Sequence, residues 1–136
     1  MAQTTNTRAV VSDYVAALVK GDVDALRASF AADATWTMPG DLPVSGTWTG
    51  PDQIIDGFLA GMMERLDPTV PVQVEPGAII ADGELAVAQW TSRARTRDGQ
   101  QYENDYSVLF RVRDSKIVEV FEYLDTLYAH RVLFGG

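Results

Sequence analysis

An aspartate at the end of an aromatic-rich segment is the first candidate for chemistry in this sequence. If 117–125 is extended, one of its faces carries Ile117, Glu119, Phe121, Tyr123 and Asp125. A carboxyl group held among apolar side chains is desolvated, which raises its pKa toward general acid-base use. Asp125 also precedes Thr126 and Leu127, so the alternative is that it caps a closing helix.

The segment before it, 101–113, offers polar groups to the same pocket. Every second residue lies on its more apolar face: Tyr102, Asn104, Tyr106, Val108 and Phe110. That face should point inward. Asn104 and Tyr106 would then be hydrogen-bonding groups among aromatic rings, as is usual in small-molecule pockets. The alternative is that Asn104 lies at a wide mouth of the sheet and meets water.

Tyr14 lies on the apolar stripe of a predicted helix, where an aromatic ring is either core or part of a pocket wall. The same two interpretations apply to a set of aromatic residues and methionines that could enclose a substrate: Trp36, Met38, Trp48, Phe58, Met62, Trp90 and Tyr123. The predicted site therefore has Asp125 and Tyr14 as catalytic residues, and this set with Asn104 and Tyr106 as binding residues.

Three arginines, Arg93, Arg95 and Arg97, alternate along one predicted strand. They could bind an anionic group. They could also pair with Glu103 and Asp105 across a hairpin, as exposed ion pairs that contribute little to stability. We interpret them as the solvated face of the sheet.

The composition limits the classes of function that are open. The chain has 136 residues, 46% hydrophobic and 22% charged, which is typical of one globular domain over 1–136. Its net charge of −8 argues against nucleic acid and anionic membranes as partners. Cysteine is absent and His130 is the single histidine, which excludes thiol chemistry and a histidine metal cluster. We therefore expect a cytoplasmic protein that needs no cofactor, with His130 near a helix end.

Apolar residues recur at helical spacing in three segments: 8–20, 23–30 and 51–66. Gly21 ends the first helix and Asp22 is a good N-cap for the second, so these two form a hairpin. Pro51 opens the third, because proline at the first helical position loses no needed hydrogen bond. Short extended pieces over 34–38 and 45–49 separate the second helix from the third.

From Thr69 onward the apolar period changes to two, which predicts a meander of four strands over about 69–80, 84–97, 101–113 and 116–126. Asp-Gly or Asp-Ser pairs mark the three turns between them. Strands of this length should twist and curve strongly, so the sheet would wrap around the helices as a cone. Helices followed by an antiparallel meander make an α+β fold, closed by a short helix over 127–136.

The sequence resembles the nuclear transport factor 2 superfamily, specifically its SnoaL-like and ketosteroid-isomerase-like bacterial branch. The resemblance rests on Tyr14, on GDVDAL at 21–26, on FAADATW at 30–36, on Gly50 before the third helix and on DSKIVEVFEYLD at 114–125. It implies a cone-shaped α+β barrel, with N-terminal helices packed in the concave face of a strongly curved, mainly antiparallel sheet. It also implies an apolar pocket between helices and sheet.

A homodimer through the outer sheet face is also implied by the resemblance. Val118, Val120 and Leu124 lie on one face of the last predicted strand and would supply an apolar surface for it. The fold itself does not settle function, because the superfamily includes isomerases, cyclases, epoxide hydrolases, dehydratases and binding domains.

Single residues also take implied roles from the resemblance. Tyr14 falls at the position of the oxyanion-hole tyrosine of ketosteroid isomerase, and Met38 falls where that enzyme has its aspartate base. Asp125 matches one carboxylate of limonene epoxide hydrolase. That hydrolase also needs an arginine and a second aspartate two residues apart; 91–95 reads TSRAR, so only the arginine is available.

These observations predict a cofactor-independent enzyme of the isomerase, cyclase or epoxide-hydrolase type. Asp125 would move a proton of an apolar substrate, while Tyr14, Asn104 or Tyr106 polarises the substrate oxygen. The alternative is a non-catalytic binding or accessory protein of the same fold that holds an apolar small molecule. The missing partners at Met38 and Ala94 favour this alternative.

Overall fold

The computed structural model describes residues 2–135, which begin with a helical hairpin. Its helices are α1 (Ala2–Lys20) and α2 (Val23–Ala28). They join at Gly21, whose φ of 69° is a left-handed conformation that glycine adopts without strain. The Asp22 carboxylate accepts a 3.1 Å hydrogen bond from the Ala25 N–H and caps α2. The predicted hairpin is confirmed, although α1 begins earlier than expected.

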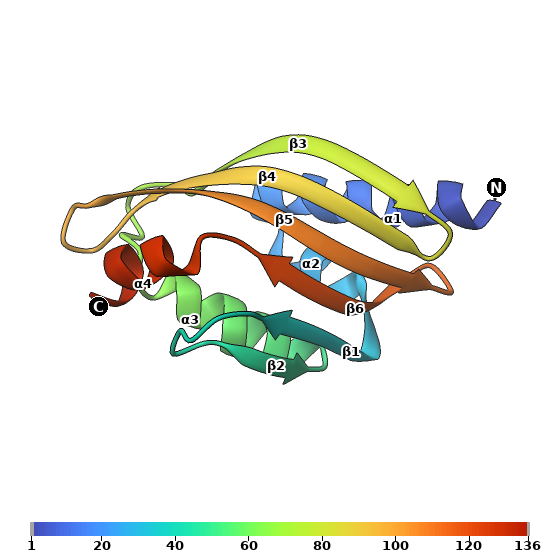
Figure 1. Cartoon of the computed structure of the whole chain (residues 1–136), viewed down its shortest axis with the longest axis horizontal. Coiled ribbons are helices and arrows are strands. Elements are labelled where there is room, and N and C mark those ends of the chain that lie inside the picture. The colour runs from blue at the N-terminus through green and yellow to red at the C-terminus, as the bar shows by residue number, and fades with distance from the viewer. Residues whose placement is uncertain (1, 136) are drawn as a thin grey trace.

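Six strands form one curved sheet: β1 (Phe30–Met38), β2 (Gly46–Thr49), β3 (Gln73–Asp82), β4 (Leu85–Arg95), β5 (Gln101–Arg113) and β6 (Lys116–Tyr123). Their order is β2-β1-β6-β5-β4-β3, and only β1 and β6 run parallel among the described residues (Figure 1). Since β2 and β3 are free edges, the sheet is not closed. The last two strands of the predicted meander are joined as expected, but β6 ends three residues early.

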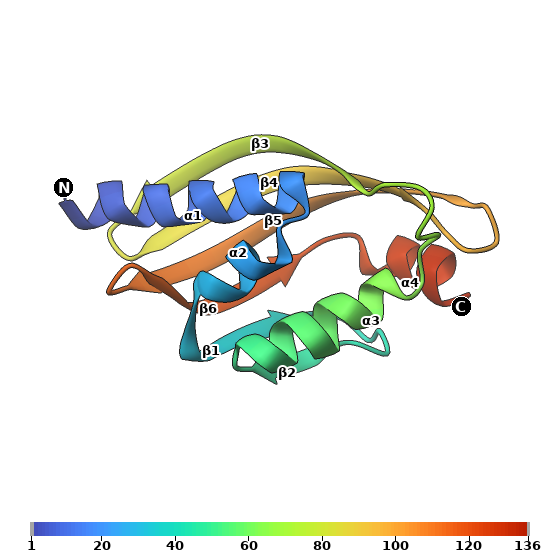
Figure 2. The same cartoon turned by 180° about the vertical axis from the view of Figure 1, so that it is seen from behind.

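The helices cover one face of this sheet, and α1 and α2 lie on its near side in Figure 2. A further helix, α4 (Thr126–Phe134), follows β6 and packs at the end of the sheet. The predicted α+β fold, with helices in the concave face of a mainly antiparallel sheet, is confirmed. None of the helices within residues 2–135 has the length and apolar character needed to cross a membrane.

The third helical segment is a π-helix, η1 (Gln53–Leu59), which continues into one α-helical turn, α3 (Ala60–Met63). The sequence predicts an α-helix here; the position of the helix is confirmed, but its predicted α-helical hydrogen-bond pattern is wrong. A π-helix has i→i+5 hydrogen bonds, and such segments are frequent at functional sites. Here it buries the adjacent Ile54 and Ile55 together with Phe58.

Gly57 of η1 is expected to resist replacement by alanine. A Cβ atom at Gly57 would lie 2.9 Å from Cζ3 of the Trp48 ring, whereas one at Gly61 would meet only Val44 Cγ1 at 4.0 Å. Gly57→Ala should therefore lower the free energy of unfolding by about 1–2 kcal/mol. Gly61→Ala should raise it by about 0.5 kcal/mol, because alanine favours the helix. Urea unfolding of both variants checks this, and a stabilised Gly57→Ala protein would contradict it.

A bulge in β6 adds one residue to that strand. Arg111 of β5 pairs with Glu119, but the next residue, Val112, pairs with Ile117. Val118 is therefore the additional residue, opposite no partner of its own on β5. The alternation of side chains along β6 is interrupted at this point.

The bulge decides which side chains of β6 point inward. Ile117 is buried before it, and Val120 and Glu122 are buried after it. Tyr123, in contrast, is 54% exposed. The uninterrupted alternation expected from Ile117 to Asp125 is therefore wrong, because one inserted residue moves every later side chain to the other face.

The outer apolar face predicted from Val118, Val120 and Leu124 is wrong for the same reason. Val120 is fully buried inside the sheet, while Val118 and Leu124 are half-buried. These three residues do not share an outer face. A homodimer is therefore an expectation from the resemblance alone.

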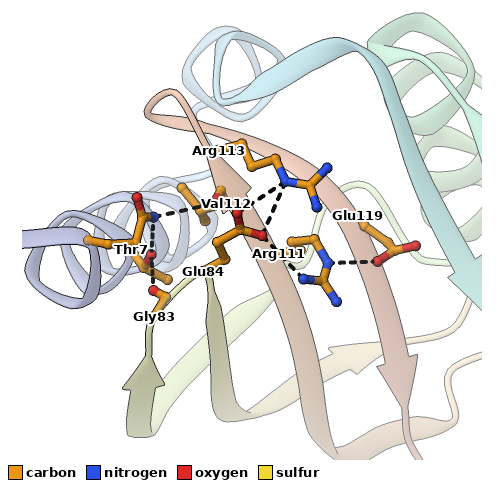
Figure 3. A network of polar contacts seen from close by, with 8 residues as sticks. Thr7, Gly83, Glu84, Arg111, Val112, Arg113 and Glu119 are labelled. Carbon is orange, nitrogen blue, oxygen red and sulfur yellow. Dashed lines mark hydrogen bonds and ion pairs between the residues drawn. The ribbon is translucent and has the colours of Figure 1, made fainter.

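Charged side chains occupy the outward face of the sheet near the β3–β4 turn (Figure 3). Glu84 accepts hydrogen bonds from Arg111 and Arg113, and Arg111 also donates to Glu119 at 3.1 Å. The same turn holds α1, since the Thr7 hydroxyl donates a 2.6 Å bond to a backbone carbonyl there. The Thr7 bond therefore holds α1 at this end of the sheet, and the cavity lies toward the other end of α1.

Candidate active site

A cavity of about 470 Å³ lies between the helices and the inner face of the sheet. Its walls come from all the helical segments and from strands β1, β3, β4, β5 and β6, and they are mostly apolar. Of the predicted site residues, six line it: Tyr14, Trp36, Phe58, Met62, Trp90 and Tyr106. Two further polar lining residues, Tyr102 and Glu122, were not among the predicted site residues.

Glu122 brings a carboxyl group into this apolar cavity. The residue is 5% exposed, and its Oε1 accepts a 2.9 Å hydrogen bond from Nε1 of Trp36. No hydrogen bond in residues 2–135 reaches the second oxygen, Oε2. Because no fully buried side-chain oxygen in the described chain lacks a partner, Oε2 must be accessible from the cavity. Glu122 can therefore accept a hydrogen bond or a proton from a ligand.

The environment of Glu122 changes its acidity. Burial raises the pKa of Glu122 to about 7, and the hydrogen bond from Trp36 opposes part of that rise. Both the carboxylate and the carboxylic acid are therefore populated near neutral pH. A group in this state can act as a general base in one step and as a general acid in the next.

Tyr14 presents a hydroxyl group to the same cavity. Its ring is held by Phe30, Trp36 and Phe110, with centroid distances of 5.7, 6.2 and 5.4 Å. Burial and the charge of Glu122 raise the pKa of Tyr14 well above its ordinary value, so the phenol stays protonated. Within residues 2–135 no hydrogen bond uses this hydroxyl. It is therefore a donor available to a ligand, and its catalytic role stays a prediction.

Asp125 lies outside the cavity. It is exposed, and its carboxylate accepts a 3.0 Å hydrogen bond from the Tyr128 N–H, which caps α4. The expectation that Asp125 lies in an apolar pocket is wrong, because β6 ends at Tyr123 and the bulge has reversed the alternation before it. Glu122 is the carboxyl that the cavity contains.

Asp125→Ala is expected to lower the free energy of unfolding by about 1 kcal/mol through loss of the helix cap. Asp125→Asn, which keeps an acceptor for the Tyr128 N–H, should stay within a few tenths of a kcal/mol of the wild type. Thermal or urea unfolding of the two variants checks this. A large loss in the asparagine variant would mean that Asp125 does more than cap α4.

Four of the predicted binding residues lie elsewhere. Met38 is buried in the core. Trp48 packs against η1, and its Nε1 donates a hydrogen bond to the Val44 carbonyl. Asn104 is buried on the predicted inner face of β5, next to the cavity but not in its wall. Tyr123 is on the outward face, so its predicted place in the pocket is wrong.

Arg93 points away from the cavity. Its guanidinium pairs with Glu103 at 2.9 Å, as the ion-pair interpretation predicts, and also with Glu75 at 2.7 Å, which was not predicted. Its neighbours Ser92 and Ala94 line the cavity instead. The arginine that epoxide-hydrolase chemistry would need is therefore not in the cavity.

The cavity opens beside the end of α1, where its lining includes exposed apolar side chains. Val19, Val23 and Met63 are 47%, 46% and 47% exposed and give this opening an apolar rim. Lys20 is the one basic side chain in the described lining, and it is also exposed. An apolar ligand would therefore meet apolar side chains from the rim inward.

One signal in the sequence could have found Glu122. It is the single acidic residue between Val120 and Leu124, on a face otherwise read as apolar. An acid on an apolar face either points to a buried site or interrupts a dimer surface. Tyr102 could have been found from its place on the predicted inner face of β5.

Residues 11–120 match the SnoaL-like domain family. The match covers most of the chain and agrees with the fold, so the protein belongs to this family. Its fold is that of the nuclear transport factor 2-like proteins. A comparison with curated proteins gave no match.

Solved structures share the fold over most of the chain. An NTF2-like protein from Burkholderia xenovorans LB400 has 28% identity and a TM-score of 0.76, over 96% of this chain and 97% of that one. A protein named as a SnoaL-like polyketide cyclase, from Jannaschia sp. CCS1, has 16% identity and a TM-score of 0.78, over 98% and 95%. A protein with a ketosteroid isomerase-like fold from Catenulispora acidiphila DSM 44928, in complex with trimethylamine, has 23% identity and a TM-score of 0.68, over 84% and 83%.

Proposed function

We propose that the protein is a cofactor-independent enzyme that moves a proton within an apolar carbonyl compound, with Glu122 as general base and acid. The observation that carries the proposal is a buried carboxyl with one free oxygen in a mostly apolar cavity. The phenol of Tyr14, also free, lines the same cavity. The neighbour named as a polyketide cyclase supports this class of reaction.

The reaction begins at a carbon atom next to the substrate carbonyl. The Glu122 carboxylate removes a proton from that carbon, and the electron pair moves onto the carbonyl oxygen to form an enolate. The Tyr14 hydroxyl donates a hydrogen bond to this oxygen, where negative charge develops. The apolar walls exclude water and strengthen that hydrogen bond.

Two outcomes follow from the enolate. If Glu122 returns the proton to a different carbon atom, the product is an isomer of the substrate. If the enolate carbon attacks a second carbonyl of the same molecule, a ring closes and the new alkoxide takes the proton from Glu122. Either route restores the Glu122 carboxylate and leaves no net change of oxidation state.

Exchange of carbon-bound protons tests the proposal without knowledge of the natural substrate. We expect the protein to accelerate the exchange of the α-protons of 2-tetralone, an apolar ketone, for deuterium in D₂O, followed by NMR. Glu122→Gln keeps the acceptor for Trp36 but cannot take the proton, so exchange should fall to the background rate. Glu119→Gln, on the outward face of the same strand, should leave exchange unchanged. No acceleration by the wild type over buffer would refute the proposed enzyme.

A non-catalytic binding protein is the second candidate function. The observation that favours it is the unpaired carboxyl of Glu122 among aromatic rings, which suits a small organic cation. The trimethylamine complex of the Catenulispora protein is consistent with such a ligand. Binding of trimethylamine that Glu122→Gln abolishes, without exchange of 2-tetralone protons, would support this candidate over the enzyme.

A further inference from the structure

A chain of hydrogen bonds runs along the inner face of β5, away from Glu122. The hydroxyl groups of Tyr102 and Tyr106 are 2.6 Å apart, and Nδ2 of Asn104 donates a 3.0 Å bond to the Tyr102 oxygen. Both tyrosines line the cavity, while Asn104 is buried and does not belong to its lining. The mechanism above uses none of these three groups.

The orientation of Asn104 is fixed by its other partner. Its Nδ2 also donates a 3.0 Å bond to the backbone carbonyl of Asp125, so both amide protons are used. An amide nitrogen does not accept a hydrogen bond. The Tyr102 proton must therefore point either to Tyr106 or into the cavity.

The tyrosine pair has one hydrogen-bond donor left for a ligand. The two phenols carry two protons, and the bond between them uses one. Burial raises the pKa of both Tyr102 and Tyr106, so neither phenol loses its proton near neutral pH. Within residues 2–135 neither hydroxyl donates a further hydrogen bond, since Asn104 is a donor to Tyr102. One phenolic proton is therefore left to point into the cavity, whichever tyrosine holds it.

This donor lies at a different level of the cavity from Glu122. Val108 of β5 pairs with Glu122, and Tyr106 is two residues further along β5 toward the β4–β5 turn. Two residues of a strand span about 7 Å. Asn104 bonds to the tyrosine pair and also to the Asp125 carbonyl, which lies between the end of β6 and the start of α4. The Tyr102–Tyr106 pair therefore lies near this junction. A ligand that contacts Glu122 can therefore reach the tyrosine pair with a second group.

We propose that the Tyr102–Tyr106 pair is a second binding subsite that takes a hydrogen-bond acceptor of the substrate, and that Asn104 is its positioning residue. The substrate class is then an apolar ring system with two oxygen functions, one facing Glu122 and Tyr14 and one facing the pair. This inference rests on the proposed function, because it takes the same cavity to be the substrate-binding site.

Calorimetric titration with two probes tests the subsite. 6-Methoxy-2-tetralone carries a second oxygen acceptor on the far ring, and 2-tetralone lacks it. We expect the wild type to bind the methoxy compound roughly five-fold more tightly, as one added hydrogen bond predicts. Tyr102→Phe/Tyr106→Phe should abolish this preference and keep the affinity for 2-tetralone, which also reports that the variant is folded.

The single variants and a control sharpen the test. Tyr102→Phe and Tyr106→Phe each leave one phenol with a free proton, so each should keep part of the preference. Tyr128→Phe should keep all of it, because among the described residues the Tyr128 hydroxyl bonds only to backbone groups at Gln101 and Glu103. Equal affinities in the wild type, or a preference that survives in the double variant, would overturn the subsite. If the preference behaves as expected but deuterium exchange is absent, the enzyme proposal fails and the subsite stands.

Discussion

Glu122→Gln is expected to stabilise the folded protein at neutral and alkaline pH. The pKa of Glu122 is about 7 in the folded chain, against an ordinary value of 4.5. The folded state therefore binds more protons than the unfolded state between these values, and stability falls as the pH rises. The protonated carboxyl contributes its full stability below about pH 4.5, and this is lost as the pH rises through 7. The loss is about 3 kcal/mol, which glutamine does not incur.

Urea unfolding between about pH 4 and pH 9 measures this effect. The difference in unfolding free energy between Glu122→Gln and the wild type should be near zero at the acid end and about 3 kcal/mol at the alkaline end. Glu119→Gln is the matched control, since it removes the same charge from the outward face of β6, where Glu119 pairs with Arg111. Its difference should not grow in this direction. A constant difference for Glu122→Gln would show that its carboxyl is not titrating in a buried site.

The order of helices and strands could be predicted because each boundary has a local cause. Gly21 and Asp22 separate the first two helices by backbone conformation and capping, which depend on neighbouring residues only. The inner face of β5 followed from simple alternation, since pairing with β4 runs without a register shift from Leu85 to Arg95. The π-helix could not be predicted, because Ile54, Ile55 and Phe58 also fit an α-helical stripe.

The site could be predicted only up to the bulge in β6. Tyr14 lies on a regular helix and Tyr106 on a regular strand, and both reach the cavity as their spacing suggests. Glu122 lies in the cavity where Asp125 was expected, because the bulge at Val118 shifts the alternation of side chains along β6. This bulge is set by the pairing of β6 with β1 and β5. Such pairing is a property of the assembled sheet. A shift of one residue is enough to move an acid from solvent to core.

The bulge also explains why the cavity holds the carboxyl of Glu122, which the simple alternation of side chains places on the outer face. A buried acid without a cationic partner lowers stability, so it is more often a functional group than a structural one. The Trp36 N–H reduces that cost by hydrogen bonding to Glu122 Oε1. The tryptophan thus acts on both stability and acidity, which makes it the next informative position.

Trp36→Phe is expected to destabilise the protein by about 3 kcal/mol at about pH 8 and by clearly less at about pH 5. Phenylalanine lacks the N–H that donates to Glu122 and fills less of the space beside Phe58 and Tyr14. A hydrogen bond to a charged group contributes about 1.5–3 kcal/mol, more than one to a neutral acid. Since the N–H favours the carboxylate, its removal should also raise the pKa of Glu122 further.

Trp48→Phe is the control that separates the charge from the packing. The Nε1 of Trp48 donates to the backbone carbonyl of Val44 at 3.0 Å, an acceptor whose charge does not change with pH. Its loss should therefore cost the same free energy of unfolding at both pH values. If Trp36→Phe also costs the same at both, the bond to Glu122 does not involve a titrating carboxylate. A cost that rises with pH only in Trp36→Phe shows that Trp36 stabilises the basic form on which proton abstraction depends.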